Sequence, residues 1–285
     1  MAEQIGGISV LISVYSGESA AHFKECLESL ARQTVPAGEV LIIKDGPLGE
    51  NLEEVIALYS GGLPIRTVAL QQNVGLGSAL SAGVEECRFD KIARMDADDI
   101  CALDRLELQA KFFEAHPEID VVGGSIREFD ADPLLGATER RLPSEHMAIE
   151  ALAATRNPIN HMTVAFRKRA VLAAGNYRPR QGFEDYDLWV RMLLNGSRFH
   201  NLPDVLVFAR CGNGMQRRRG GWDYARREAA LFWSFRSAGF LSTGQAARTI
   251  ICRTPARLLP ASLRTQLYNY FLRHRVSREG LLWRG

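Results

Sequence analysis

The stretch that decides the fold is Lys91-Ile92-Ala93-Arg94-Met95-Asp96-Ala97-Asp98-Asp99. Residues 91–95 have the character of a buried strand, and three carboxylates follow within four residues. Carboxylates packed this closely repel one another unless water or a cation relieves the repulsion, and Mg2+ prefers one or two carboxylates together with phosphate oxygens. Aspartate is also common in turns and helix caps. Taken alone, the acidic turn (residues 96–99) is therefore equally well explained as an ordinary strand-to-loop turn.

The acidic turn is one of several strand ends in a repeating pattern. Apolar runs of strand length lie at 8–14, 40–43, 65–70 and 91–95, with helical patterns at 20–32, 52–59, 75–87 and 105–115. This alternation predicts an α/β fold with a doubly wound, mostly parallel sheet. Such sheets bind ligands beyond the carboxyl ends of their strands. The polar residues at these ends include Tyr15, Asp45, Asn73 and the acidic turn.

Beyond residue 130 the alternation weakens. We expect strands at 160–166 and 205–209, and helices at 168–173, 184–194, 224–235, 244–252 and 263–273. Residues 205–285 hold fifteen arginines, no lysine and three acids, a net charge of +12, which leaves −10 for the rest of a chain with net charge +2. This asymmetry suggests that the tail faces an anionic partner, either membrane phospholipid or nucleic acid.

The bulk composition is that of a soluble globular protein. The chain has 285 residues, of which 46% are hydrophobic and 24% charged, enough for one large α/β domain or a domain with an appended segment. Five scattered cysteines without C-x-x-C spacing indicate free thiols rather than disulfides or a zinc site. No secretory signal and no membrane-length apolar stretch stand out. We therefore expect a cytoplasmic protein.

Five segments together resemble the family 2 glycosyltransferases, the inverting GT-A enzymes that use nucleotide-diphosphate sugars. The resemblance covers about residues 7–210, in order and at normal spacing. It implies a GT-A, Rossmann-like catalytic domain at 1–210, followed by a basic helical segment at 211–285. The segments are Val10-Leu11-Ile12-Ser13-Val14-Tyr15, Glu39-Val40-Leu41-Ile42-Ile43-Lys44-Asp45-Gly46, Asn73-Val74-Gly75-Leu76-Gly77, Met95-Asp96-Ala97-Asp98-Asp99 and Phe183-Glu184-Asp185-Tyr186-Asp187-Leu188-Trp189.

The resemblance implies a UDP-sugar donor. Tyr15 would lie near the base, and Asp45 matches the carboxylate that accepts a hydrogen bond from the uracil N–H, although an aspartate before glycine is also an ordinary turn. The chain departs from the usual Asp-Asp-Gly-Ser at Lys44 and Pro47, and has Ser16 where asparagine is usual. These departures make the identity of the base a weaker inference than the fold.

Further donor contacts follow from the remaining matched segments. By the resemblance, Asn73 and Gly75 would belong to the nucleotide-sugar-binding loop, and Asp96 would lie near the ribose or base. Asp98 would bind Mg2+ or Mn2+ bridging the diphosphate, where the ion acts as a Lewis acid. Arg94 is either a second positive contact or a surface residue at the strand edge.

Asp185 is the expected general base. Inverting transfer needs a carboxylate opposite the leaving group, to take the proton of the acceptor hydroxyl as it attacks the anomeric carbon. Glu184 or Asp187 is the alternative base. Acidic residues in a helical first turn are also stabilised by the helix dipole without a catalytic duty. The segment Asn157-Pro158-Ile159-Asn160-His161 is also reminiscent of the family, and His161 either touches the diphosphate or acceptor or is a structural histidine.

The acceptor is expected to be a lipid-linked saccharide. Residues after 205 lack the Q-x-x-R-W element of processive synthases, so we expect addition of a single sugar. The chain most resembles bacterial exopolysaccharide and O-antigen transferases of the amylovoran-biosynthesis type, including Arg257-Leu258-Leu259-Pro260, and these often act on lipid-diphosphate-linked sugars. The resemblance therefore implies an acceptor linked to undecaprenyl diphosphate, in the assembly of a surface polysaccharide.

The basic tail fits such an acceptor. Arg217, Arg218 and Arg219 form a cation cluster, and the later helical patterns mix arginine with aromatic residues. Basic helices with aromatic residues can lie on an anionic membrane surface, so we expect peripheral contact with the inner membrane. The alternative is the solvated face of an ordinary helical bundle. Nucleic-acid binding is not expected, because no binding module accompanies the charge.

Two other functions compete with this interpretation. A sugar-nucleotide pyrophosphorylase would need a glycine-rich, arginine-containing phosphate loop after the first strand, and Ser16-Gly17-Glu18-Ser19 does not supply one. A catalytically silent nucleotide-sugar-binding or scaffold protein would have no need for Asp185 beside Asp96 and Asp98.

Overall fold

The computed structural model describes residues 7–130, 138–211, 220–259 and 274–275. Four parallel strands form the first half of the sheet in the order β3-β2-β1-β4. They are β1 (Ile8–Val14), β2 (Glu39–Lys44), β3 (Ile65–Ala69) and β4 (Lys91–Met95). The strand order reverses between β1 and β4, which is where ligands of such sheets bind. The predicted strands at 8–14, 40–43, 65–70 and 91–95 are confirmed to within a residue or two.

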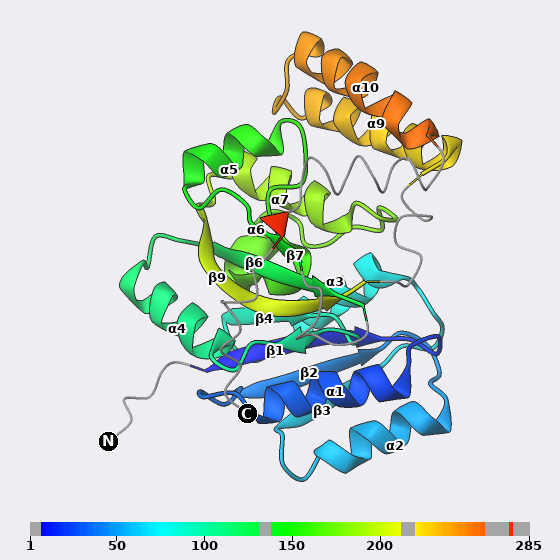
Figure 1. The fold of residues 1–285 in the computed structure, drawn as a ribbon, viewed down its shortest axis with the longest axis vertical. Helices are drawn as coiled ribbons and strands as arrows, with labels where there is room; N and C mark the ends of the chain where they lie inside the picture. Colours follow the sequence, from blue (N-terminus) through cyan, green and yellow to red (C-terminus); the bar gives the residue numbers. More distant parts are fainter. Residues whose placement is uncertain (1–6, 131–137, 212–219, 260–273, 276–285) are drawn as a thin grey trace.

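Helices cover both faces of the sheet (Figure 1). Because successive side chains of a strand point to opposite faces, Val10 and Ile12 of β1 pack into one apolar cluster while Leu11 packs into the other. The first cluster includes α1 (Ala20–Ala31), α2 (Glu50–Tyr59) and α4 (Arg105–Ala115), and the second includes α3 (Leu76–Glu86), α5 (His146–Ala153), α6 (Lys168–Ala173) and α7 (Glu184–Leu194). This is the predicted doubly wound α/β architecture.

The second half of the sheet is mixed. Strand β8 (Ala165–Arg167) runs antiparallel to β4, and β6 (Val121–Phe129) runs antiparallel to β8 but parallel to β9 (Phe199–Arg210). The short strands β5 (Ile100–Cys101), β7 (Thr138–Arg140) and β10 (His274–Arg275) pair with β9, β6 and β7 respectively. The parallel ladders are the longer ones, so most paired residues lie in parallel register.

The expected strand at 160–166 is wrong. The chain instead forms a 3-10 turn, η1 (His161–Thr163), before β8. Both the backbone N–H and the hydroxyl of Thr163 donate to the Asn160 carbonyl, at 2.9 and 2.8 Å. Local bonds of this kind compete with a strand ladder. Strand β9 begins earlier than the predicted 205–209, and β6, β7 and α5 were not predicted.

Two helices follow the sheet and pack on α7 (Figure 1). They are α9 (Trp222–Ser237) and α10 (Thr243–Leu258), which extend the predicted helices at 224–235 and 244–252. Tyr186 of α7 lies in one apolar cluster with Phe232 and Phe235 of α9. The predicted helix at 263–273 lies outside the described residues.

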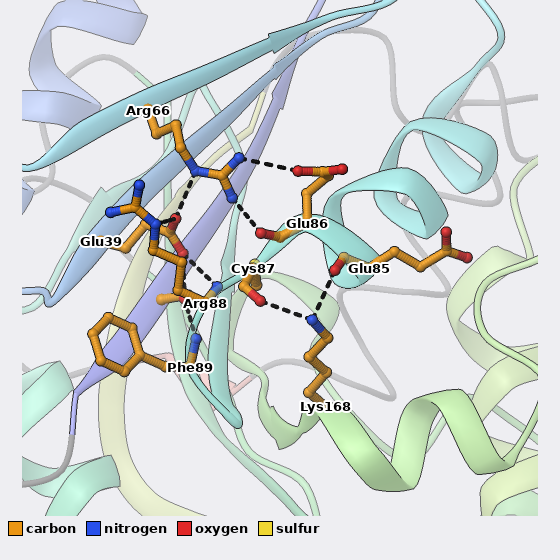
Figure 2. Close-up of polar contacts among 9 residues, drawn as sticks. Glu39, Arg66, Glu85, Glu86, Cys87, Arg88, Phe89 and Lys168 are labelled. Carbon is orange, nitrogen blue, oxygen red and sulfur yellow. Dashed lines mark hydrogen bonds and ion pairs between the residues drawn. The ribbon is translucent and has the colours of Figure 1, made fainter.

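An ionic network around buried Glu39 lies at the amino-terminal edge of the sheet (Figure 2). Glu39 is 1% exposed and accepts hydrogen bonds from Ser9 Oγ (2.6 Å), Arg66 Nε (2.9 Å) and the Arg88 N–H (2.9 Å). Burial alone would raise the pKa of Glu39, but the hydrogen bonds from Arg88, Ser9 and Arg66 outweigh it and lower the pKa. Lys168 Nζ donates to the Cys87 carbonyl (2.8 Å) just beyond α3. The network therefore anchors the carboxyl end of the helix whose amino end begins the site.

Candidate active site

The carboxyl end of β2 is joined to the loop that starts α3. Asp45 is buried, and its Oδ1 and Oδ2 accept hydrogen bonds from the Val74 N–H (2.7 Å) and the Gly75 N–H (3.1 Å). Gly46 has φ +87°, and a Cβ there would lie 2.7 Å from the Asn73 backbone nitrogen, so both conformation and space require glycine. The structure thus brings Asp45 together with the loop that contains Asn73 and Gly75.

Tyr15 lies at the end of the neighbouring strand, β1. Its side chain is 43% exposed, and a Cβ on Gly17 would come within 2.4 Å of its ring, so the ring lies against the Gly17 backbone. Asn73 is also exposed. Both side chains therefore border solvent at the edge where a ligand of the parallel strands would bind.

Arg94 lies under the acidic turn. It is 2% exposed and forms a bidentate ion pair with Asp96, with Nη1 at 2.7 Å from Oδ2. Burial would lower the pKa of Arg94, but the Asp96 carboxylate outweighs it and raises the pKa. The alternative of a surface residue at the strand edge is therefore wrong. A second buried arginine, Arg105, donates to the Arg94 carbonyl at 2.7 Å.

The other two carboxylates of the turn differ in exposure. Asp99 is buried and accepts a hydrogen bond from the Arg210 N–H (2.8 Å) at the end of β9, while Arg210 Nε donates to the Asp98 carbonyl (3.2 Å). Burial raises the pKa of Asp99, and the charges of Asp96 and Asp98 raise it further. Asp98 is half-buried. Arg210 was missed by the sequence reasoning, because nothing distinguishes it from the other tail arginines.

The turn suits a cation that takes some ligands from a bound diphosphate. Its carboxylates are hard oxygen donors of the kind that Mg2+ and Mn2+ use. In the described part of the chain, His, Cys, Asp and Glu side chains form no group of three or more that could enclose a metal ion. Asp98, half-buried and beside the Asp96–Arg94 pair, fits a site completed by phosphate oxygens rather than an all-protein cage.

The first turn of α7 carries the candidate base. Asp185 Oδ1 accepts a hydrogen bond from the Tyr186 N–H (2.7 Å), and its Oδ2 accepts one from Asn157 Nδ2 (2.5 Å). Asp187 is buried and forms two ion pairs: its Oδ1 lies 2.7 Å from Arg180 Nε, and its Oδ2 lies 2.9 Å from Arg191 Nε. These ion pairs give Asp187 a structural role and make it the poorer alternative base.

The Arg94–Asp96 pair and the carboxylates at the start of α7 act on the same buried groups. The pKa of buried Tyr177 is raised, mainly by burial. Arg94 acts to lower this pKa, and the carboxylates of Asp185 and Asp96 act to raise it. Burial also raises the pKa of Glu184, with Asp185 raising and Arg94 lowering it. Charges act on one another in this way only at short range. Arg94 therefore lies within electrostatic reach of both acidic groups.

The start of α3, which follows the loop held by Asp45, touches the acidic start of α7. A Cβ on Gly77, in the first turn of α3, would lie 2.8 Å from Glu184 Cγ and 2.5 Å from the Arg178 carbonyl. The glycine therefore permits close approach of the two helices. The structure therefore brings Glu184 close to the helix that begins at the loop held by Asp45.

His161 lies at the base of this arrangement. Its Nε2 shares a hydrogen bond with the Tyr177 hydroxyl (2.9 Å), and its ring meets Trp189 edge-on at 6.1 Å. Burial and the positive charge of Arg94 lower the pKa of His161 well below its usual value, so the imidazole is neutral at neutral pH. The observed contacts are those of a structural histidine. Trp189 is fully buried and belongs to the core.

Comparison with known proteins identifies the family. Residues 9–175 match the family described as "Glycosyl transferase family 2". The amylovoran biosynthesis glycosyltransferase AmsE of Erwinia amylovora is 40% identical over 91% of this chain and 97% of its own length. The UDP-Gal:α-D-GlcNAc-diphosphoundecaprenol β-1,3-galactosyltransferase of Escherichia coli is 33% identical over 96% of this chain and 99% of its own length.

Solved structures agree with the fold. TarS residues 1–349 from S. aureus in complex with UDP-GlcNAc align with a TM-score of 0.66 at 18% identity, over 93% of this chain and 73% of that one. The mannosyltransferase PcManGT from Pyrobaculum calidifontis, in complex with GDP-Man and Mn2+, aligns with a TM-score of 0.58 at 18% identity, over 93% and 80%. The expected GT-A architecture is confirmed. The chain belongs to glycosyl transferase family 2.

Proposed function

We propose that this protein transfers a single hexose from a UDP-sugar to a saccharide carried on a lipid diphosphate, with inversion at the anomeric carbon. The observation that carries the proposal is the convergence of three features: Asp96 paired with buried Arg94, the loop held by Asp45, and Glu184 at the start of α7, which lies against Gly77 just beyond that loop. The galactosyltransferase relative, whose name gives a UDP-sugar donor and a diphosphoundecaprenol-linked acceptor, supports the choice of both substrates. Membership of the family removes the support for a pyrophosphorylase.

On the donor side, we assign roles to five residues. Tyr15 borders the base, Asp45 accepts from the base while holding the Asn73–Gly75 loop, and Asp96 faces the ribose. An ionised carboxylate can accept about four hydrogen bonds, so the two bonds from the loop are compatible with a third from the base. Asp98 would hold Mg2+ or Mn2+, and such an ion would supply positive charge to the departing nucleotide diphosphate. Arg94 contributes mainly by fixing the Asp96 carboxylate.

On the acceptor side, Asp185 takes the proton of the attacking hydroxyl. The acceptor oxygen forms a bond to the anomeric carbon, while the bond to the diphosphate breaks and its electron pair leaves with UDP. Glu184 is the alternative base, and burial raises the pKa of its carboxyl group. His161 is assigned to supporting the site through Tyr177.

The function is tested by a panel of UDP-, GDP- and dTDP-sugars with a divalent cation and a lipid-diphosphate-linked saccharide. We expect turnover with UDP-sugars, release of UDP and a product that gains one sugar. A protein that binds UDP-sugars but turns over none of the panel would be the silent binding protein instead. A polymer ladder would reject single-sugar transfer.

We also propose that the helices after the sheet rest on the anionic inner-membrane surface from the cytoplasmic side. Exposed apolar side chains on α9 and α10 include Trp222 (69%), Trp233 (49%) and Ile251 (70%). Arg226 and Arg248 are exposed on the same two helices. Among the described residues no helix has the length and apolarity needed to span a bilayer. The Arg217–Arg219 cluster lies outside the described residues.

Some arginines of the tail form ion pairs within the protein. These arginines are therefore not assigned to the membrane contact. Buried Glu228 forms ion pairs with Arg253 and Arg257, both at 2.7 Å. These two arginines therefore stabilise the pairing of α9 with α10. Membrane contact is assigned to the exposed residues rather than to the net charge as a whole.

Replacing Trp222 and Trp233 together by alanine should weaken binding to anionic vesicles about tenfold, because apolar burial at the interface is lost. Vesicle co-sedimentation measures this, and UDP affinity should not change. Leu58→Ala on α2 is the matched control, since Leu58 is 64% exposed on a helix away from the tail. Equal co-sedimentation of the double variant and the wild type would refute the membrane contact.

A further inference from the structure

Asn157 makes a side-chain contact to the proposed base. Its Nδ2 donates to Asp185 Oδ2 at 2.5 Å, while Oδ1 of the same carboxylate accepts from the Tyr186 N–H at 2.7 Å. The two donors come from different parts of the chain and hold opposite oxygens. Together they fix the rotation of the carboxylate plane, because each oxygen has its own donor.

The Asn157 amide is itself fixed in orientation. Its Oδ1 accepts from the Ile159 N–H (3.3 Å), so the Nδ2 group is the one that faces Asp185. The following residue is Pro158, which restricts the backbone of Asn157 to extended conformations. A carboxamide held in this way is preorganised to orient a neighbouring group.

The segment that carries Asn157 is anchored to the sheet. Buried Asn201 of β9 donates to the Pro158 carbonyl (3.1 Å), and buried Asn160 donates to the Gly124 carbonyl of β6 (2.9 Å). The 157–160 segment is thereby attached to two strands of the sheet. Asn157 links this rigid frame to the first turn of α7.

We propose that Asn157 is a positioning residue that holds the Asp185 carboxylate in the orientation needed to accept the proton of the acceptor hydroxyl. The inference rests on the proposed role of Asp185 as the base. Asn157 exchanges no proton: the proton passes from the acceptor oxygen to Asp185 as the new glycosidic bond forms and UDP leaves. Its amide sets the direction from which that proton is received.

Asn157→Ala should lower kcat roughly 10- to 100-fold, because a misplaced catalytic group costs rates of this order. The KM for the UDP-sugar and the affinity for UDP should stay within about twofold of the wild type, because these depend on the donor side. Asn195→Ala is the matched control, because Asn195 is also an asparagine next to α7 but follows its carboxyl end. Its side-chain Nδ2 donates to the Ala173 carbonyl (3.0 Å), away from Asp185. We expect wild-type kcat from it.

A double-mutant cycle separates positioning from general support of the fold. The Asp185→Asn background lacks the carboxylate that Asn157 would position. There, Asn157→Ala should lower the single-turnover rate by less than about twofold, because substitutions of residues that act through one another have non-additive effects. An equal loss in both backgrounds, or a wild-type kcat for Asn157→Ala, would overturn the inference while leaving the base assignment intact. Full activity of Asp185→Asn would instead reject the base assignment itself.

Discussion

Asp185→Asn lowers kcat by roughly 10²- to 10⁴-fold, the usual contribution of a positioned general base. The amide has the shape of the carboxylate but cannot accept the proton of the acceptor hydroxyl. UDP affinity should stay within about twofold of the wild type, because Asp185 belongs to the acceptor side of the site. Steady-state transfer assays measure the first quantity, and isothermal titration of UDP with a divalent cation measures the second.

Two neighbouring carboxylates are the controls for this result. Glu184→Gln should cost less than Asp185→Asn, and Asp187→Asn should act mainly on stability because Asp187 is buried between Arg180 and Arg191. A thermal unfolding scan separates the two kinds of effect. If Glu184→Gln gave the larger loss of kcat with an unchanged unfolding midpoint, the base would be Glu184 rather than Asp185.

Asp98→Ala has the second large expected effect. It should lower kcat/KM by about 10³-fold, since a divalent cation supplies several kcal/mol of charge stabilisation to a departing diphosphate. Chelation of the divalent cation in the wild type should cause a similar loss. The two treatments should not add, because they remove the same interaction. UDP titrations with Mn2+ and with chelator check this on binding alone.

Asp104→Asn is the matched control for the metal prediction. Asp104 is an exposed carboxylate a few residues beyond the acidic turn, and it makes no side-chain capping bond to α4. Its replacement should leave both activity and the effect of chelator unchanged. Full activity of the wild type after chelation, or cation-dependent UDP binding that persists in Asp98→Ala, would remove Asp98 from the metal site.

Much of the fold could be predicted because its strands are apolar runs bounded by turns. The bounds predicted for α6 and α7 are also confirmed, since both follow a clear helical pattern. Strand β6 escaped prediction because it contains Gly123 and Gly124, which weaken any strand pattern. The structure explains both glycines: a Cβ would lie 2.2 Å from Asn201 Oδ1 at the first and 2.5 Å from Leu206 Cδ1 at the second. Close approach of β9 requires them.

The acidic members of the site could be predicted, but their partners could not. Asp45 and the acidic turn follow apolar strands, so their position at one sheet edge comes from the alternation alone. The contact of Arg210 with Asp99 spans 111 residues, and that of Asn157 with Asp185 spans 28. No local pattern encodes such pairs, because the packing of β9 and α7 creates them. The burial of Arg94 likewise depends on its ion pair with Asp96, which strand periodicity does not reveal.

The most direct test of the account is the anomeric configuration of the product formed from a UDP-sugar and a lipid-diphosphate-linked saccharide, determined by NMR. A base opposite the leaving group predicts one added sugar, with a β-linkage from an α-configured UDP-sugar. An α-linked product would contradict direct attack by a hydroxyl that Asp185 deprotonates across from the diphosphate.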